Sequence, residues 1–161
     1  MSLRHRFLSY PIHPGIPVYG DTPKPVFQSC LDMAKGDVCN TAVFTMSNHS
    51  GTHVDAPRHF IADGRPIADY SARELAFEKP VVVDAPSGPG ELIGAGPFEA
   101  LGDRLGEADF LLIRTGFWKR RGSDPLYHEA NPGISESAAR LLRSKGVRLR
   151  GIGLDSISVG S

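Results

Sequence analysis

Glycine and proline punctuate this sequence along its whole length, with 18 glycines and 13 prolines in 161 residues. Both residues interrupt regular helices and strands, so the chain can form only short elements joined by many turns. A chain of this length can bury the core of one ordinary domain. Because no internal repeat or low-complexity linker divides it, we expect a single domain over residues 1–161.

The first half of the sequence predicts extended structure. Short extended pieces are expected at Phe7–Tyr10, Ile16–Tyr19 and Pro25–Leu31, separated by Pro-Gly and Gly-Asp turn signals. Thr41–Ser47 alternates apolar and polar residues with period two, which is typical of a half-buried strand.

The second half alternates predicted strands and helices. Expected strands are Pro80–Ala85, Phe110–Arg114 and Val147–Leu154. Expected helices are Ser71–Phe77, which begins with a capping box, Phe98–Leu105, and a segment that Ser135 caps and Gly146 ends. Asp155, just after the last strand, is expected to tie down a strand end. This order predicts a mixed-sheet α/β domain with helices packed on one side.

Composition excludes several classes of partner. Eighteen basic and 18 acidic residues give a net charge of zero, and Lys119–Arg121 is expected to be a solvated loop, so nucleic acid is not an expected partner. No apolar run approaches the ~18 residues of a membrane span. Cys30 and Cys39 are too few for a disulfide framework. We therefore expect a soluble cytoplasmic protein.

The stretch SNHSGTHVDAPRHF at residues 47–60 contains half of the chain's six histidines. His49, His53 and Asp55 offer imidazole nitrogens and a carboxylate oxygen, donors that suit zinc at roughly 2.0–2.2 Å. Manganese or iron accepts the same donors. Three protein ligands leave coordination positions open, as in catalytic zinc sites. Because Gly51 weakens a helix here, we expect a loop to present these ligands.

His59 and Thr52 are the neighbouring candidates for supporting roles. The spacing places His59 beside the metal without requiring it to coordinate, where a neutral histidine can take a proton from water and return it to a leaving group. Thr52 can donate a hydrogen bond that orients a ligand. The competing interpretation is that these are ordinary polar residues of a loop. The spacing favours a metal site and leaves the reaction open.

Aromatic residues are candidates for substrate binding. Tyr19 and Trp118 can stack on an aryl substrate, and each is equally suited to packing. Phe60 is expected to pack the histidine loop into the core, with substrate contact as the alternative. Ser156 and Ser158 have no visible histidine–acid partner, so we do not expect a serine triad.

The stretch His49–Phe60 resembles the signature HxGTHxDxPxHF of the cyclase-like metal-dependent hydrolases, a family that contains kynurenine formamidases and isatin hydrolases, and it matches every fixed position. Other segments resemble the family across nearly the whole chain. Ile16–Asp21 is similar to its N-terminal element, shortened by one proline, while Leu112–Gly116 and Gly151–Ser158 are similar to its LIRTG and GIDxxS strand ends.

The resemblance implies a three-layer β/β/α swivelling fold and a homodimer. It also implies that His49, His53 and Asp55 bind a divalent metal, with zinc first and manganese second, that Asp55 can bridge to a second ion, and that His59 is the general acid and base. The implied reaction is hydrolysis of N-formylkynurenine to kynurenine and formate by metal-activated water.

One departure from the family pattern concerns a second metal. The resemblance implies a further histidine and glutamate after the GIDxxS segment, whereas the sequence ends at Ser161 before any such residues. We therefore expect either that the C-terminal part of the domain is missing or that the protein has no second-metal site. Three alternatives to formamidase activity stay open: hydrolysis of a cyclic amide of the isatin type, a polyketide-type cyclase activity, and a catalytically silent metal-binding protein.

Overall fold

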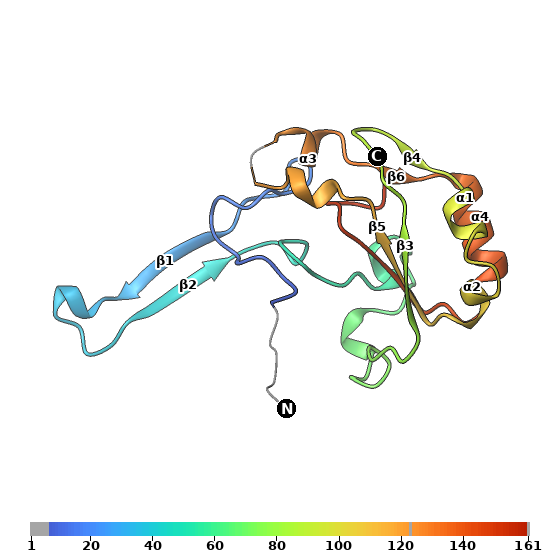
Figure 1. Ribbon diagram of the computed structural model, residues 1–161. Helices are drawn as coiled ribbons and strands as arrows, with labels where there is room; N and C mark the ends of the chain where they lie inside the picture. The colour runs from blue at the N-terminus through green and yellow to red at the C-terminus, as the bar shows by residue number, and fades with distance from the viewer. Residues whose placement is uncertain (1–6, 123, 161) are drawn as a thin grey trace, which may run out of the picture. The chain divides into compact units, whose positions relative to one another are not determined.

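A computed structural model describes residues 7–122 and 124–160 of the chain (Figure 1). Its tertiary contacts divide the chain into two compact units, Met1–Asp69 (unit 1) and Tyr70–Ser161 (unit 2). Strands and helices occur together, with parallel strands in unit 2 and antiparallel strands in unit 1. The prediction of a mixed α/β fold is confirmed, although the parallel and antiparallel pairs lie in separate sheets.

Unit 1 contains one two-stranded antiparallel sheet, formed by β1 (Val26–Leu31) and β2 (Thr41–Thr45). Both strands lie where the sequence predicts extended structure. A 3₁₀ turn, Met33–Lys35, lies between them, and its backbone N–H at Ala34 donates to the Asp32 carboxylate at 2.9 Å. This side-chain cap satisfies a donor that the short turn leaves unpaired.

The two most N-terminal extended pieces do not form strands in the part of unit 1 that the structure describes. Phe7–Tyr10 is exposed and pairs with no described strand. Within Ile16–Tyr19, the side chains of Ile16 and Val18 are buried without strand pairing. The sequence predicted a short extended piece here, and the structure describes it as a segment with two buried side chains and no strand pairing.

Unit 2 is built on a parallel sheet with strand order β3–β5–β7. These strands are β3 (Pro80–Asp84), β5 (Phe110–Arg114) and β7 (Gly151–Leu154). The third strand begins four residues later than the sequence predicts, because residues 146–149 form a turn in which the Leu149 N–H donates to the Gly146 carbonyl at 2.9 Å. A second pair, β4 (Leu92–Ile93) and β6 (Gly133–Ile134), is also parallel and was not predicted.

The described residues of unit 2 include the α-helices α1 (Gly96–Glu99), α2 (Asp103–Glu107), α3 (Leu126–Glu129) and α4 (Glu136–Lys145). The prediction of α4 is confirmed, since the Ser135 hydroxyl accepts from the Ala138 N–H at 3.2 Å and Gly146 ends the helix. None of the helices in the described ranges is long and apolar enough to cross a membrane.

The single helix predicted at Phe98–Leu105 is instead divided between α1 and α2. Gly102 lies between them with a φ of +54°, a left-handed value that breaks the helical path. Glycine adopts this conformation without the steric penalty that a Cβ atom would bring. The apolar residues at both ends still face the core, because Phe98 and Leu105 are both buried.

The predicted helix at Ser71–Phe77 is wrong. The capping-box contact forms, with the Ser71 N–H donating to the Glu74 carboxylate at 2.8 Å, but only turns follow. The Arg150 guanidinium donates to the carbonyls of Glu74 and Ala76 at 2.7 and 2.6 Å, so these two carbonyls at the end of the segment are paired by a residue far along the chain. The backbone N–H groups of Glu74, Leu75 and Ala76 each donate to the carbonyl three residues earlier, so the segment forms tight turns and no α-helix.

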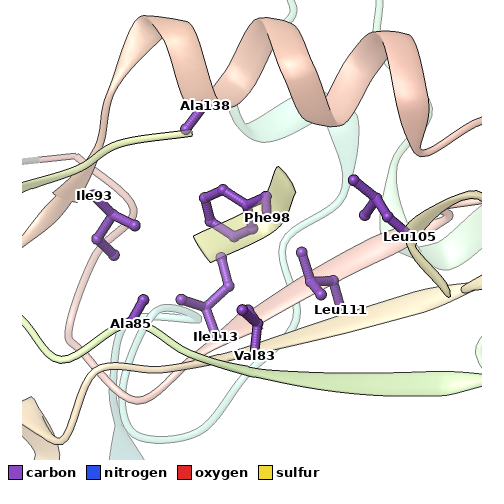
Figure 2. Packing of buried hydrophobic residues seen from close by; sticks show 8 residues of the cluster. All are labelled: Val83, Ala85, Ile93, Phe98, Leu105, Leu111, Ile113 and Ala138. Atoms are coloured by element: carbon purple, nitrogen blue, oxygen red, sulfur yellow. The ribbon is translucent and has the colours of Figure 1, made fainter. Parts of the chain in front are cut away.

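The hydrophobic core of unit 2 lies between its parallel sheet and the helices α1, α2 and α4 (Figure 2). Figure 2 shows Phe98 at the centre of this cluster, with Ala138 on α4 to one side and the strand residues to the other. The buried members are Val83, Ala85, Ile93, Phe98, Leu105, Leu111, Ile113 and Ala138. Helices therefore cover one face of the sheet, as the sequence predicts.

Polar side chains fasten the carboxyl ends of the parallel strands. The Asp155 carboxylate accepts from the backbone N–H groups of Thr115 and Gly116, each at 2.8 Å, which confirms its expected role at a strand end. Arg114 donates to Asp84 on the adjacent strand at 2.8 Å. This hydrogen bond from Arg114 holds the pKa of the Asp84 carboxyl below its usual range.

Candidate metal centre

A loop in unit 1 presents the histidine cluster, as the sequence predicts. Beyond β2, the Ser50 N–H donates to the Ser47 carbonyl at 3.1 Å, and Gly51 then adopts a φ of +71°. A Cβ atom at Gly51 would also lie 3.3 Å from a side-chain carbon of Ile12. Both the left-handed backbone and the close approach favour glycine at this turn.

A short 3₁₀ helix, Pro57–His59, ends the loop. Proline begins it, and the His59 N–H donates to the Ala56 carbonyl at 2.9 Å. Proline suits a first helical position because its missing N–H would have no partner there. This single turn brings the His59 ring back over the loop, where its centroid lies 4.1 Å from that of His49.

Three donor atoms converge within the loop. The Nδ1 atom of His49 lies 3.2 Å from the Nε2 atom of His53 and 2.9 Å from the Oδ1 atom of Asp55. The remaining separation, from His53 Nε2 to Asp55 Oδ1, is 3.5 Å. The structure therefore brings together all three residues that the sequence selected as metal ligands.

The backbone fixes the orientation of the His53 ring. Its Nδ1 atom lies 2.9 Å from the Gly51 carbonyl oxygen, which can only accept a hydrogen bond. The proton is therefore assigned to Nδ1, and the lone pair of Nε2 faces the other two donors. Histidine ligands of metals usually donate their second ring N–H to such an acceptor. This contact could not be predicted from sequence, because it depends on the turn at Gly51.

The spacing of the three donors fits a small divalent ion. Ligands at about 2.1 Å in tetrahedral geometry lie about 3.4 Å apart, and the observed separations are 2.9, 3.2 and 3.5 Å. Borderline imidazole nitrogen together with a hard carboxylate oxygen is a donor set for zinc, manganese or iron. The residues present therefore fit such an ion.

His59 belongs to a second, overlapping group of donors. The ligand atoms of His49, Asp55 and His59 all lie within 4.8 Å of one another. His49 and Asp55 are thus common to both groups, while His53 and His59 compete for the third position. The shorter separations on the His53 side favour His53 as the ligand, with His59 adjacent to the centre.

The metal-free interpretation also accounts for some of these contacts. One proton on His49 Nδ1 can be shared between His53 Nε2 and Asp55 Oδ1, which gives an ordinary polar network. The side chains are partly solvated, with exposed fractions of 29% for His49, 25% for His53 and 40% for Asp55. Solvent access is needed for an open catalytic site and is tolerated by a surface network, so the exposure does not separate the two interpretations.

Ser50 is a feature of the loop that the sequence did not single out. The residue is only 3% exposed, and its hydroxyl has no hydrogen-bond partner among the described residues. A buried hydroxyl without a partner destabilises a fold. Ser50 directly follows His49 in the tight turn of the loop. The turn therefore forms although it leaves the Ser50 hydroxyl buried without a hydrogen bond among the described residues.

The remaining candidates, for substrate contact and for orienting a ligand, make fewer contacts that would support those roles. Phe60 is 75% exposed, so the expectation that it packs into the core is wrong, and its ring instead lies 4.2 Å from that of His59. Thr52 is exposed, and its hydroxyl makes no hydrogen bond within the described part of the chain. Tyr19, in unit 1, is 47% exposed. Trp118, in unit 2, is 45% exposed and lines a hollow of about 330 Å³ with Val82 and Leu112.

Comparison with known proteins identifies one family. The family model described as "Putative cyclase" matches residues 7–161. A kynurenine formamidase from Geobacillus thermodenitrificans is 34% identical over 149 residues, which cover 88% of this chain and 64% of that protein. A kynurenine formamidase from Bacillus cereus is 31% identical and is covered to 68% of its length. This chain therefore spans about two thirds of the length of these relatives.

Solved structures share the fold. Isatin hydrolase A from Ralstonia solanacearum superposes with a TM-score of 0.75 at 20% sequence identity, over 96% of this chain and 67% of that one. A crystal structure described as a novel cyclase superposes with a TM-score of 0.69 at 18% identity. Both likenesses extend across nearly the whole of this chain.

Proposed function

The chain belongs to the putative cyclase family, and from this premise we propose that it is a metal-dependent hydrolase of small aryl amides. The best candidate substrate is N-formylkynurenine, which would yield kynurenine and formate. Kynurenine formamidases about 30% identical to this chain support this choice of substrate. The observation that carries the proposal is the convergence of His49 Nδ1, His53 Nε2 and Asp55 Oδ1 within 3.5 Å of one another.

His49, His53 and Asp55 would hold the divalent ion. Zinc is the first choice and manganese the second, because both accept mixed imidazole and carboxylate donors. When bound, the ion supplies Lewis acidity and a lowered pKa for water in the site. One ion needs no residue beyond these three, whereas a second would need Asp55 to bridge and further ligands to join it.

His59 is proposed as the general base and acid. Its imidazole removes a proton from the water that attacks the formyl carbonyl carbon, and then donates that proton to the nitrogen of the departing arylamine as the C–N bond breaks. Protons balance over the cycle, since His59 returns to its starting form. The Phe60 ring, 4.2 Å away, restricts the orientations open to the His59 ring.

We also propose which side chains contact the substrate and how the chain assembles. Phe60 is the best-supported aromatic contact for an aryl ring because it is exposed and lies against His59. Tyr19 and Trp118 keep the same proposed role as exposed aromatic side chains. Thr52 is proposed to orient a ligand. We also propose that both units form a single domain and that two chains assemble as a homodimer.

Turnover of N-formylkynurenine tests the proposal. We expect hydrolysis that is abolished by a chelator and restored by zinc or manganese. His59→Ala should lower kcat by roughly 10²–10⁴-fold, the usual contribution of a positioned acid–base group. Lys24→Ala, a change of an exposed residue outside the loop, is the matched control and should leave kcat unchanged.

The outcomes of this assay separate the alternatives. Ring opening of isatin without turnover of N-formylkynurenine would identify a cyclic amide hydrolase. Bound metal without hydrolysis of any amide would favour a silent metal-binding protein, and ring closure of a polyketide would favour a cyclase. Full turnover by His59→Ala would contradict the proposed proton transfer.

A further inference from the structure

The segment that follows the proposed ligands closes on itself. Beyond the 3₁₀ helix Pro57–His59, the Ile61 N–H donates to the Pro57 carbonyl at 2.9 Å, and the Gly64 N–H donates to the Ile61 carbonyl at 2.8 Å. A Cβ atom at Gly64 would lie 2.6 Å from the Pro57 carbonyl carbon, so a larger residue would force the backbone apart. Residues 57–65 therefore form a compact closed loop that includes the proposed acid and base, His59.

Arg58 is a cation of this closed loop without a partner in the protein. Its side chain is exposed, and its guanidinium makes no hydrogen bond or ion pair with the residues that the structure describes. Asp63 is exposed in the same loop and does not pair with it. Arg65, by contrast, donates to the Asp69 carbonyl. The N–H donors of Arg58 are therefore free to bind a group from outside the chain.

Arg58 directly precedes His59, and the backbone of both residues is held in place. The Arg58 N–H donates to the Arg65 carbonyl at 3.4 Å, and the His59 N–H donates to the Ala56 carbonyl at 2.9 Å. A 3₁₀ helix has three residues per turn, so adjacent side chains diverge by about 120°. The His59 ring lies against His49, with centroids 4.1 Å apart, and Arg58 leaves the turn in another direction. Since a guanidinium has no lone pair to offer, Arg58 does not compete for the metal.

The charge of this part of unit 1 favours an anionic ligand. Residues 47–65 carry two aspartates, Asp55 and Asp63, and two arginines, Arg58 and Arg65, and so have no net charge. The proposed divalent ion adds two positive charges to this neutral segment. A positive site attracts a negatively charged ligand, and a guanidinium offers paired N–H groups that match the two oxygens of a carboxylate.

The proposed substrate carries such a carboxylate. In N-formylkynurenine it lies at the end of a short carbon chain, which is attached to the aryl ring beside the formamide group. The carboxylate is therefore remote from the amide that reacts, which suits a cation whose side chain diverges from that of His59. Isatin is a neutral cyclic amide without a carboxylate and would leave Arg58 without a partner.

We propose that Arg58 binds the carboxylate of the substrate and so makes the site selective for aryl amides that carry an amino-acid group, over neutral cyclic amides. The inference rests on the proposed function and names the substrate class of that same site. Arg58 contacts no reacting atom in this scheme, so its loss weakens binding and leaves the chemistry at the amide in place.

Binding of two matched probes tests this contact without turnover. Kynurenine carries the carboxylate, and kynuramine is the same molecule without it. Isothermal titration calorimetry in the presence of zinc should show that Arg58→Ala raises the Kd of kynurenine by about 10- to 100-fold, the usual value of a hydrogen-bonded contact between charged groups, and leaves that of kynuramine unchanged. Arg58→Lys keeps the charge but loses the paired N–H groups, so its effect should be intermediate. Arg148→Ala removes an exposed arginine of unit 2 and is the matched control, which should bind both probes like the wild type.

Steady-state kinetics separate this contact from the proposed hydrolysis. Arg58→Ala should raise KM for N-formylkynurenine with kcat unchanged, and KM for N-formylkynuramine should stay the same. Kynurenine binding that Arg58→Ala weakens, in a protein without turnover, would contradict the hydrolysis and support the contact. Turnover with equal KM in the wild type and in Arg58→Ala would overturn the contact and leave the hydrolysis standing. A wild type that binds kynurenine no more tightly than kynuramine would also overturn the contact.

Discussion

The two units of this protein differ in how they bury their side chains. Unit 2 has a continuous core in which helices cover one face of a parallel sheet, with Phe98 at its centre. Among the described residues of unit 1, only four are buried, namely Ile16, Val18, Pro25 and Ser50. The proposed metal ligands belong to unit 1. The unit that carries the proposed chemistry is therefore the one with the smaller core, and it has more to gain from a bound ion and a partner chain.

The largest contrast concerns the loss of an aromatic ring. Phe98→Ala removes a fully buried ring from unit 2 and should lower the free energy of unfolding by about 3–5 kcal/mol. Phe7→Ala removes a ring that is fully solvated in unit 1 and should change it by less than about 0.5 kcal/mol. Urea unfolding followed by circular dichroism measures both. Equal losses would mean that the cores do not differ as described.

Metal binding should stabilise unit 1 selectively. Zinc at 100 times its dissociation constant should add about 2.7 kcal/mol to the stability of the state that binds it. Hydrogen exchange should therefore slow at residues 47–60 and remain unchanged in β5. Asp55→Asn removes one proposed ligand and should abolish this protection. Equal protection of β5 would show that the effect is global and would contradict the contrast between the units.

Replacing two serines by alanine should change the free energy of unfolding by smaller amounts and in opposite directions. Ser135→Ala removes the N-cap of α4 in unit 2 and should lower the free energy of unfolding by about 1 kcal/mol. Ser50→Ala removes a buried hydroxyl without a partner in unit 1 and should raise the free energy of unfolding by up to about 1 kcal/mol. Thermal unfolding of both variants measures the two signs. A loss of stability in Ser50→Ala would mean that its hydroxyl has a partner.

The smallest expected effect is on stability at acidic pH, and it comes from Asp109 in unit 2. Burial acts to raise the pKa of Asp109, but hydrogen bonds from the Glu78 and Lys79 N–H groups and from Arg150 outweigh it and hold the pKa below the usual 3.8. A depressed carboxyl pKa stabilises the fold above its unfolded value, and this contribution is lost as the pH falls from about 4 through the folded value. Asp109→Asn should therefore lose less stability than the wild type between pH 5 and pH 3. Parallel acid curves for the two proteins would contradict this role.

Much of unit 2 could be predicted because its signals are local. Apolar runs predict β3 and β5, and a capping serine with a following glycine predicts α4. The two-residue strands β4 and β6 were missed because they are too short to carry a periodic pattern. The helix predicted at Ser71–Phe77 is replaced by turns, and its last carbonyls are paired by Arg150, 74 and 76 residues away, a contact that local sequence cannot indicate.

The candidate site was predicted by residue type and spacing, but its arrangement was not. Spacing grouped His49, His53 and Asp55 because they lie within seven residues of one another, and the turn at Gly51 then brings their donor atoms together. Spacing also placed His59 beside this group, but it could not show the single turn beginning at Pro57 that brings the His59 ring against His49. The exposure of Phe60 was also missed, because an apolar residue next to a predicted turn gives no indication of which way it faces.

Metal content is the most direct test of the central claim that His49, His53 and Asp55 bind a divalent ion with His59 beside it. Chains saturated with zinc and then dialysed would be measured by elemental analysis. The account predicts at least one zinc per wild-type chain, retention of that ion by His59→Ala, and its loss from His53→Ala. A wild type without bound zinc or manganese would contradict the claim, and so would an ion that His53→Ala retains and His59→Ala loses.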